Sequence, residues 1–384
     1  MIYHICPHFD LFIKITISRF DTIKAGTSCC LELSAGSSTE TRMRTSDHEG
    51  FTVYSYDIGD PRWREILLKD CTGIFLHNLQ TYMLKPLLDL PENIPFYFRS
   101  YGGDIFDLIY DDDRNFYMTR TSQIIREIKP VKERLSGLLN SIYCKVIPHK
   151  RNWEKTRDQK IKLLEKTFAV SPTCPQEFEM LQQRWPDLSL KYLPFGYFPL
   201  SEEEYSDRGI ERENIIIGHS NSPGQNHVDA FEFIKDYKCK EKIIVPLSYK
   251  KSRYSDAVIR EGRKILGDRF YPLITFLPKN EYYDILSSSY AFIEFSVYQQ
   301  GLANIVFMMK QGANVYLPER NPIYIFFVEN GITVFSVERD LSEYHLKTRR
   351  ITEAERKKNN DILTRFYSSD IDRATAEVIV ERFS

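Results

Sequence analysis

The sequence predicts an α/β protein of two domains, each built around a parallel sheet. Short apolar runs alternate with longer stretches of helical period in both halves of the chain, which is the pattern of βαβ units. The 384 residues suit two domains of ordinary size, and 42% apolar residues are enough for buried cores. The stretch 195–213 is polar and rich in turn-forming residues, as expected of a linker between the halves.

The expected elements follow this rhythm along the chain. In the first half, strands are expected at 2–6, 51–56, 73–77, 95–99, 141–147 and 191–195. In the second half, they are expected at 214–218, 242–246, 271–276, 290–295, 314–317 and 332–335. Helices are expected near 227–235, 255–266, 282–288, 303–310 and 321–329. We place one domain at 1–197 and the other at 198–384, where the last helix, at 369–383, can pack back on the first domain.

Composition argues against several classes of protein. Lys and Arg (52) nearly balance Asp and Glu (53), and a net charge of -1 gives no indication of a nucleic-acid partner. No apolar run reaches the roughly 18 residues of a membrane span, and the N-terminus does not resemble a signal peptide. The seven cysteines include no C-x-x-C pair, which indicates reduced thiols. We expect a cytoplasmic protein that meets a membrane only at its surface.

A small polar loop follows the strand expected at 214–218 and leads into a helix. Gly218 and Gly224 permit tight turns and close backbone approach, and Ser and Asn side chains can cap the helix. In α/β domains, such a loop at the carboxyl end of a strand binds an anion or a sugar. The alternative is a turn and helix cap without a ligand. The candidate donor-binding residues are Gly218, His219, Ser220, Asn221, Asn226 and His227.

Two further loops follow neighbouring strands. Gly301, after the strand at 290–295, lets backbone amides approach a diphosphate. Glu294 is either a ligand to a ribose or sugar hydroxyl or a carboxylate satisfied by backbone amides. Tyr249 either stacks on a base or sugar or packs in the protein. Carboxyl ends of parallel strands share one edge of a sheet, so these loops should converge. The candidates here are Tyr249, Glu294, Gln299, Gln300, Gly301 and Asn304.

The same loops carry a family resemblance. The matching motifs are Gly218-His219-Ser220-Asn221-Ser222 with Asn226-His227, Val245-Pro246-Leu247-Ser248-Tyr249, Tyr298-Gln299-Gln300-Gly301-Leu302-Ala303, Asn321-Pro322-Ile323, Tyr101-Gly102-Gly103-Asp104-Ile105-Phe106 and His77-Asn78-Leu79. Through them the sequence resembles the bacterial TDP-N-acetylfucosamine:lipid II N-acetylfucosaminyltransferases, or 4-alpha-L-fucosyltransferases, of glycosyltransferase family 56. The sequence departs from the family pattern at Ser222 and Tyr290, where the family has Asp, and at Tyr298, where it has Arg.

The resemblance implies a GT-B fold, with two Rossmann-like domains facing across a cleft. It implies a nucleotide-diphosphate sugar donor on the C-terminal domain and a lipid-linked glycan acceptor on undecaprenyl diphosphate. The sugar would be an acetamido deoxy-sugar such as N-acetylfucosamine. The enzyme would act at the inner face of the bacterial inner membrane, without a cofactor. A non-catalytic sugar- or nucleotide-binding module and a sugar-nucleotide epimerase are the alternatives.

The transfer reaction needs a base for the acceptor hydroxyl. We expect Asp104 in this role, with His77 as the alternative, because both follow expected strands of the first domain. A turn or helix cap is the competing interpretation of Asp104. We expect no metal, because the acidic triplet at 111–113 is a weak motif and His4-x-Cys6-x-His8 has no fourth ligand nearby.

The stretch 122–142 combines an apolar stripe with basic residues and contains Pro130. A basic amphipathic helix can lie on an anionic membrane surface. A core-facing helix with a solvated basic face is the other interpretation, which we favour. The basic residues that would meet the membrane are Arg126, Lys129, Lys132 and Arg134.

Overall fold

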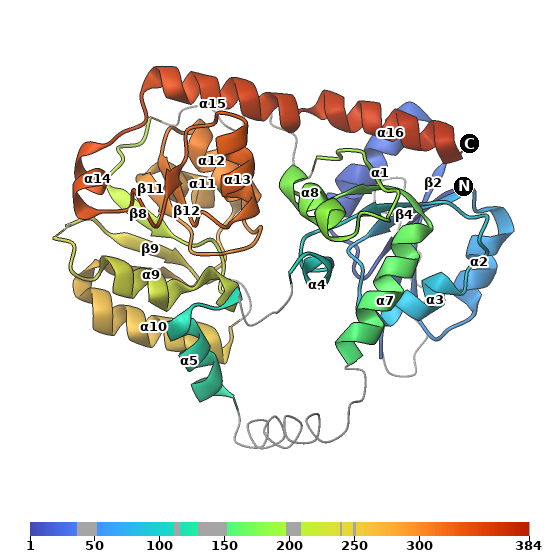
Figure 1. Ribbon diagram of the computed structural model, residues 1–384, viewed down its shortest axis with the longest axis horizontal. Helices are drawn as coiled ribbons and strands as arrows, with labels where there is room; N and C mark the ends of the chain where they lie inside the picture. The colour runs from blue at the N-terminus through green and yellow to red at the C-terminus, as the bar shows by residue number, and fades with distance from the viewer. Residues whose placement is uncertain are drawn as a thin grey trace. The chain divides into compact units, whose positions relative to one another are not determined.

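The computed structural model describes residues 1–36, 52–110, 116–129, 152–196, 209–238, 240–248 and 251–383. The chain forms two compact units (Figure 1), each described below by itself. The first unit comprises Met1–Asp111, Pro148–Pro199 and Phe366–Ser384. The second comprises Asp112–Ile147 and Leu200–Arg365. No helix in the described residues is long and apolar enough to cross a membrane.

A parallel sheet forms the centre of the first unit. In the described residues it has seven strands in the order β3-β2-β1-β4-β5-β6-β7. Their bounds are β1 Ile2–Cys6, β2 Ser28–Ser34, β3 Val53–Asp57, β4 Gly73–His77, β5 Phe96–Arg99, β6 Thr167–Ser171 and β7 Lys191–Tyr192. Every residue of β1, β4 and β5 is buried, which explains why these strands are continuous apolar runs rather than alternating ones.

Helices flank this sheet. They are α1 Leu11–Ile23, α2 Arg62–Asp70, α3 Leu84–Leu88, α4 Phe106–Ile109, α7 Asn152–Glu165, α8 Pro175–Arg184 and α16 Ser369–Phe383, with a 3-10 turn at Thr81–Met83. The C-terminal helix α16 packs on this unit: Thr375 donates to the Pro194 carbonyl at 2.6 Å. A Cβ on Gly73 would lie 2.3 Å from the Phe383 ring, so the helix needs glycine at that strand position.

The second unit has a doubly wound sheet. In the described residues its six strands run in the order β10-β9-β8-β11-β12-β13, and all neighbours are parallel. This order reverses between β8 and β11, the switch point at which ligands bind in such folds. The strands are β8 Asn214–Ile217, β9 Ile243–Pro246, β10 Phe270–Leu273, β11 Ser289–Ile293, β12 Asn314–Leu317 and β13 Phe335–Ser336. Pro272 lies in β10, the edge strand, where a missing amide is tolerated.

Helices lie on both faces of this sheet, with α9 and α10 on one face and α12 and α13 on the other (Figure 1). The helices of the unit are α5 Thr119–Ile128, α9 His227–Ile234, α10 Arg253–Leu266, α11 Lys279–Ser287, α12 Leu302–Lys310, α13 Pro322–Glu329, α14 Glu343–Thr348 and α15 Glu353–Phe366. Short 3-10 turns span Pro223–Gln225 and Gly267–Arg269. Ser252 caps α10 and Asn321 caps α13 through side-chain oxygens.

Most expected strands are present, with shifts of a few residues at their ends. The strand expected at 141–147 lies outside the described residues. Two strands, β2 and β6, were not predicted. Their sequences, SCCLELS and TFAVS, contain few apolar residues, which are bounded on both sides by Ser or Thr. They occupy places beside β1 and β5 that only sheet pairing reveals.

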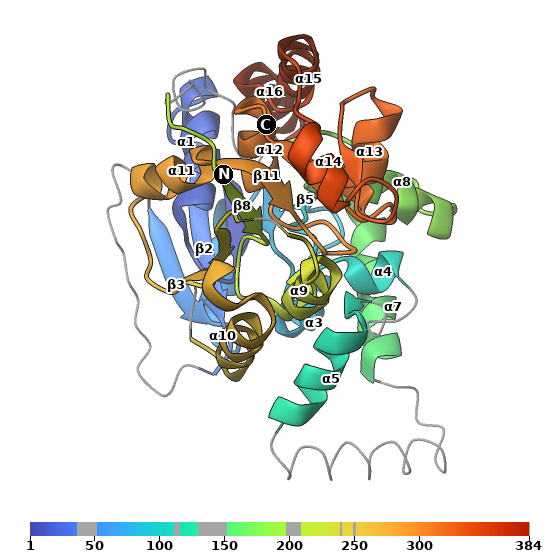
Figure 2. The same ribbon diagram turned by 90° about the vertical axis from the view of Figure 1, so that its left-hand side faces the viewer.

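The boundary expected between residues 197 and 198 would place α5 in the first domain, whereas the structure places this helix in the second compact unit. This helix packs against α9 and α10 of the second unit (Figures 1 and 2). The Asp229 side chain of α9 accepts from the backbone amides of Arg120 and Thr121, at 2.8 and 2.9 Å. These orphan amides at the start of α5 thus find an acceptor on another helix, and the Ile124 side chain is buried in the second core. Local composition cannot predict a contact between residues so far apart in the sequence, so the expected boundary did not include it.

Candidate functional site

The candidate site lies at the switch point of the second unit. Strands β8 and β11 are hydrogen-bonded neighbours, and Gly218 donates to the Ile293 carbonyl at 2.9 Å where both strands end. Gly218 has a φ of 70°, which favours glycine. The chain therefore turns sharply after β8, and it brings His219 next to Glu294, which follows β11.

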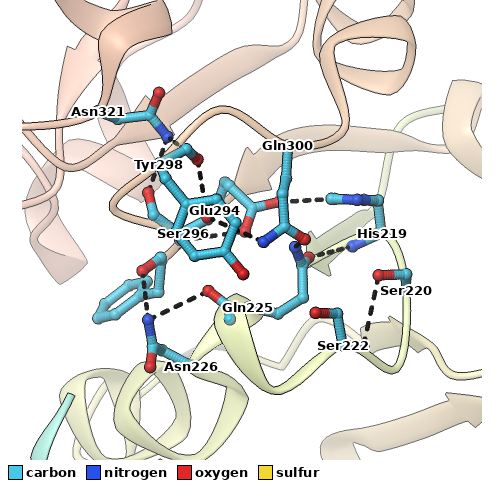
Figure 3. Close-up of polar contacts among 12 residues, drawn as sticks. His219, Ser220, Ser222, Gln225, Asn226, Glu294, Ser296, Tyr298, Gln300 and Asn321 are labelled. Atoms are coloured by element: carbon cyan, nitrogen blue, oxygen red, sulfur yellow. Dashed lines mark hydrogen bonds and ion pairs between the residues drawn. The ribbon is translucent and has the colours of Figure 1, made fainter. Parts of the chain in front are cut away.

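His219 and Glu294 form a hydrogen-bonded pair between the two loops (Figure 3). The Nδ1 atom of His219 lies 2.9 Å from Glu294 Oε2, and the Ser296 amide donates to Glu294 Oε1 at 3.1 Å. The Glu294 side chain is fully buried, whereas 13% of the His219 side chain is exposed. An ionised carboxylate only accepts hydrogen bonds, so the pair holds the proton on Nδ1 and leaves Nε2 for another partner.

Gly301 forms the floor beneath the imidazole. It has a φ of 64°, and a Cβ there would lie 2.4 Å from His219 Nδ1. It is also the N-cap of α12, whose first turn has no side-chain cap hydrogen bond. The backbone amides of the first turn of α12 and the positive end of its helix dipole favour the binding of an anion. The His219–Glu294 pair therefore lies next to the N-terminus of α12.

A chain of amides links the two loops (Figure 3). The His219 amide donates to Gln225 Oε1 at 2.8 Å, and Gln225 Nε2 donates to Gln300 Oε1 at 3.0 Å. Gln300 Nε2 lies 3.4 Å from Ser296 Oγ. Each amide is thereby oriented by its neighbour, so the half-buried Gln300 side chain holds a defined position at the site.

Asn321 is a residue that the sequence analysis used only as a family match. Its Nδ2 donates to the Ser296 carbonyl at 2.7 Å and to the Tyr298 carbonyl at 3.2 Å. Its Oδ1 accepts from the Ile323 amide at 2.8 Å. A cap that also holds the glutamine-containing loop explains an Asn-Pro pair at the start of α13.

Asn226 is turned away from the site. Its Oδ1 accepts from the Met118 amide at 2.8 Å, and its Nδ2 donates to the carbonyls of Phe116, Gly224 and Phe295 at 3.2, 3.2 and 3.0 Å. The side chain is fully buried. Its role in the structure is to join the start of α5 to both strand-end loops, which does not support the expected contact with a donor.

The other expected donor-binding residues are dispersed around this centre. His227 is fully buried at the start of α9, and burial lowers its pKa to about 3. Ser220 lies within the first loop and accepts from the Ser222 amide at 3.4 Å. Gln299 is buried in the second loop, and Asn304 is half-buried on the first turn of α12. Asn221 lines a groove on the side toward α5, and Tyr249 lies outside the described residues.

In the first unit, Asp104 braces two strand-end loops. Its carboxylate accepts from the Leu79 amide at 3.1 Å, the Ser100 hydroxyl at 2.6 Å and the Tyr101 amide at 3.1 Å. The side chain is buried, and burial raises its pKa although the hydrogen bonds from Ser100 and Leu79 oppose the shift. A buried carboxylate with these donors matches the turn interpretation rather than the base that we expected.

His77 is also enclosed by protein. Its Nε2 lies 3.1 Å from His4 Nδ1, and its Nδ1 lies 3.3 Å from the Tyr101 hydroxyl. Burial, together with His4 and Arg99, lowers the pKa of His77 well below its ordinary value. The imidazole is therefore neutral and fully buried, so the structure gives it a core position and does not favour contact with an acceptor.

The side chains of the His4-x-Cys6-x-His8 motif each contact a different neighbour. His4 pairs with His77, the Cys6 sulfur faces Cys30 at 3.8 Å, and the His8 imidazole lies 3.9 Å from Glu32. Among the described residues, no three His, Cys, Asp or Glu side chains gather as metal ligands. The acidic triplet at 111–113 is not part of the described chain.

The basic amphipathic stretch is described only as far as residue 129. Within α5, Ile124 is buried, and Ile125 and Ile128 pack against the core of the second unit. The apolar stripe of this segment thus faces the protein, in agreement with the interpretation that we favoured. Lys132 and Arg134 lie outside the described residues.

Comparison with solved structures defines the fold. The chain is similar to the trehalose-6-phosphate structure from E. coli bound with UDP-2-fluoro glucose, at 12% identity and a TM-score of 0.65, covering 100% of this chain and 99% of that chain. It is similar to alpha,alpha-trehalose 6-phosphate synthase from Burkholderia multivorans (9% identity, TM-score 0.63, 100% and 98% covered). It is also similar to sucrose-phosphate synthase from Thermosynechococcus elongatus (12%, 0.61, 99% and 97%). The fold is that of the GT-B glycosyltransferases.

The family follows from the sequence. The family model of the 4-alpha-L-fucosyltransferases, glycosyl transferase group 56, matches residues 177–374, which is more than half of the 384 residues. The matched segment contains both strand-end loops of the site. The chain belongs to this family and is a glycosyltransferase. No curated protein sequence gives a significant match.

Proposed function

We propose that this glycosyltransferase moves an acetamido deoxy-sugar, such as N-acetylfucosamine, from a nucleoside diphosphate to a lipid-linked glycan on undecaprenyl diphosphate. The observation that carries the donor assignment is the His219 imidazole, which Glu294 holds over Gly301 at the start of α12. A nucleotide-sugar presents a diphosphate, and the helix amides are donors suited to that anion; the imidazole adds a donor at Nε2 when both of its nitrogens are protonated.

The reaction places a demand on these donors. The acceptor hydroxyl forms a bond to the anomeric carbon, the bond from that carbon to the diphosphate oxygen breaks, and the nucleoside diphosphate leaves with the electron pair. Negative charge grows on the leaving group, and donors already oriented toward it lower the barrier. In our proposal, the α12 amides, the Gln300 amide and the doubly protonated imidazole of His219 supply such donors, and Glu294 holds the imidazole through Nδ1.

The acceptor hydroxyl must also lose its proton as the new bond forms, and in our proposal a water molecule accepts that proton. We propose that Asp104 positions the acceptor-domain loops through its hydrogen bonds to Leu79 and Tyr101, in place of the base role expected from sequence. His77 supports the same loops through Tyr101. This proposal is consistent with the burial of both side chains.

A lipid-linked acceptor requires contact with a membrane, and we propose peripheral attachment at the cytoplasmic face. The loop after β10 supports this: Ile274 is 63% exposed and Phe276 is 72% exposed. Exposed Lys279 follows at the start of α11. Apolar side chains with a nearby cation are suited to the interface of an anionic bilayer.

A screen of nucleotide-sugars tests the donor site. Thermal unfolding of the full chain is measured with TDP-, UDP- and GDP-linked sugars, because a ligand that binds the native state raises the melting temperature. The sugar that stabilises the protein is then offered with a prenyl-diphosphate-linked glycan, and the release of nucleoside diphosphate and the glycosylated product are both quantified.

Variants locate the site. His219→Ala and Gln300→Ala should each weaken donor binding by about tenfold to a hundredfold, the equivalent of a hydrogen bond to a charged group, with the fold retained. His345→Ala is the matched control, since His345 is a half-buried histidine of the same unit that bonds Tyr316. Wild-type donor affinity in both site variants would show that the donor binds elsewhere. Asn226→Ala should instead destabilise the fold.

A further inference from the structure

A groove of about 670 Å³ lies on the side of the first strand-end loop that faces α5. Helix α5, the loop after β8 and the beginning of α10 form its walls, and all of its lining residues belong to the second unit. Its volume is within the range of small-molecule sites. The residues that give it chemical character are Ile125, Ile128, Lys129, Asn221, Ser222 and Arg253.

The α5 wall is fixed by polar contacts. Asp229 accepts from the amides of Arg120 and Thr121 and from the Thr121 hydroxyl, at 2.8, 2.9 and 2.7 Å. At the other end of the helix, Arg253 Nη1 donates to the Ile128 carbonyl at 3.3 Å. Hydrogen bonds thus attach both ends of α5 to α9 and α10, and they hold the α5 wall of the groove in place.

The lining is cationic and apolar together. Among the described residues that line it, Lys129 and Arg253 are the charged ones and none is acidic. Ile125 and Ile128 are only partly buried against the core of the second unit, and both also line this space from successive turns of α5. Lys and Arg bind phosphate oxygens, and an isoleucine wall takes up hydrocarbon. This combination is complementary to a phosphate or diphosphate attached to an apolar chain.

The loop after β8 separates this groove from the donor site. His219, at the start of the loop, faces Glu294 and Gly301, whereas Asn221 and Ser222 line the groove. A ligand in the groove would therefore lie across one short loop from the diphosphate that we propose at His219. This separation favours a second substrate over a second part of the donor.

We propose that the groove binds the prenyl diphosphate end of the acceptor lipid, with the diphosphate at Lys129 and Arg253 and the first isoprene units along Ile125 and Ile128. The proposal rests on the lipid-linked acceptor of the proposed function. It goes further by assigning the carrier to a site on the donor-binding unit, rather than to the N-terminal domain that the family resemblance implies.

Calorimetric titration with farnesyl diphosphate tests the groove in the full chain. Farnesyl diphosphate should bind at least tenfold more tightly than farnesol or inorganic diphosphate, because only farnesyl diphosphate carries both a diphosphate and an isoprenoid chain. The double variant Lys129→Ala/Arg253→Ala should weaken its binding at least tenfold. Arg263→Ala/Lys264→Ala is the matched control, since both residues are exposed on the last turn of α10 and do not line the groove.

A second variant protects the test against loss of fold, because Arg253 also holds α5. Lys129→Glu changes an exposed side chain and should weaken farnesyl diphosphate binding at least tenfold. In turnover, it should raise the KM for a prenyl-linked acceptor, whereas the control Arg263→Ala/Lys264→Ala should leave both that KM and slow hydrolysis of the donor unchanged.

Two results would overturn the assignment. One is unchanged farnesyl diphosphate affinity in both groove variants. The other is competition of farnesyl diphosphate by the nucleoside diphosphate, with both groove variants losing nucleotide affinity instead, which would give the groove to the donor. The proposed function fails separately if no nucleotide-sugar binds the wild-type chain, whatever the groove variants do.

Discussion

Gly301→Ala probes the proposed donor site through a single methyl group. The new Cβ would lie 2.4 Å from His219 Nδ1 and 2.6 Å from Cε1, which is closer than any non-bonded contact allows. The imidazole cannot simply rotate, because its Nδ1 is bonded to the buried Glu294. The substitution must therefore displace His219 or move the start of α12.

The magnitude has two parts. Alanine at a φ of 64° costs about 1 kcal/mol, as other left-handed non-glycine residues do. Breaking the hydrogen bond between His219 and the Glu294 carboxylate costs about 2 kcal/mol, within the range for charged partners. We expect the free energy of unfolding to fall by about 3 kcal/mol in total. Donor affinity should fall at least tenfold, which corresponds to about 1.4 kcal/mol.

Gly331→Ala separates the two parts. Gly331 also has a positive φ, 73°, and a Cβ there would approach only the flexible end of Lys358, at 3.4 Å. It should lose about 1 kcal/mol of stability and keep wild-type donor affinity. Urea denaturation and nucleotide-sugar titration measure both quantities. If Gly301→Ala loses no more stability than Gly331→Ala and binds donor normally, the pair does not form part of the donor site.

Three more predictions concern other parts of the chain. Asp104→Asn should lower the free energy of unfolding by about 1 to 3 kcal/mol, because one oxygen that accepts from backbone amides becomes a donor; a variant as stable as wild type that has lost turnover would restore the base role. Glu177 is buried, which raises its pKa to about 8 from 4.5. Between pH 4.5 and pH 8 the unfolded chain binds fewer protons at Glu177 than the folded chain does. The contribution of Glu177 to the free energy of unfolding is therefore undiminished below pH 4.5 and falls by up to about 1.4 kcal/mol per pH unit toward pH 8. Glu177→Gln should remove this loss, and urea denaturation at pH 5 and 8 would reveal an unchanged pH dependence if the reasoning is wrong. Ile274→Ser/Phe276→Ser should reduce pelleting with anionic liposomes at low salt, whereas Tyr344→Ser, at a position 77% exposed, should not; equal pelleting of both variants would exclude the β10 loop as the contact.

The sequence was informative about which residues gather at the candidate site. Apolar runs end at the carboxyl ends of β8 and β11, and the polar residues that follow must lie at one sheet edge if the strands are parallel and adjacent. His219, Glu294, Gln300 and Gly301 were all identified in this way, and the structure brings them together. Gln225 and Ser296 were not, because their task is to orient other side chains and no local pattern encodes it.

The sequence was less informative about the direction of individual side chains. Asn226 looked like a donor contact, yet long-range bonds to the start of α5 turn it inward. Asp104 looked like a base, yet its acceptor oxygens are occupied by backbone amides from two loops. Both outcomes depend on segments that are far away in sequence, so composition and spacing carry no sign of them.

By itself, the sequence determined the α/β class, most of the strands and the two loops that meet at the site, because periodicity and glycine placement are local properties of the chain. Tertiary structure decided which helices complete each unit. Helix α5 joins the second unit through Asp229, and α16 joins the first through Thr375 and Phe383. The physical reason is that a helix acquires its partner only when its unpaired amides and apolar face meet acceptors and a core that the rest of the chain has already formed.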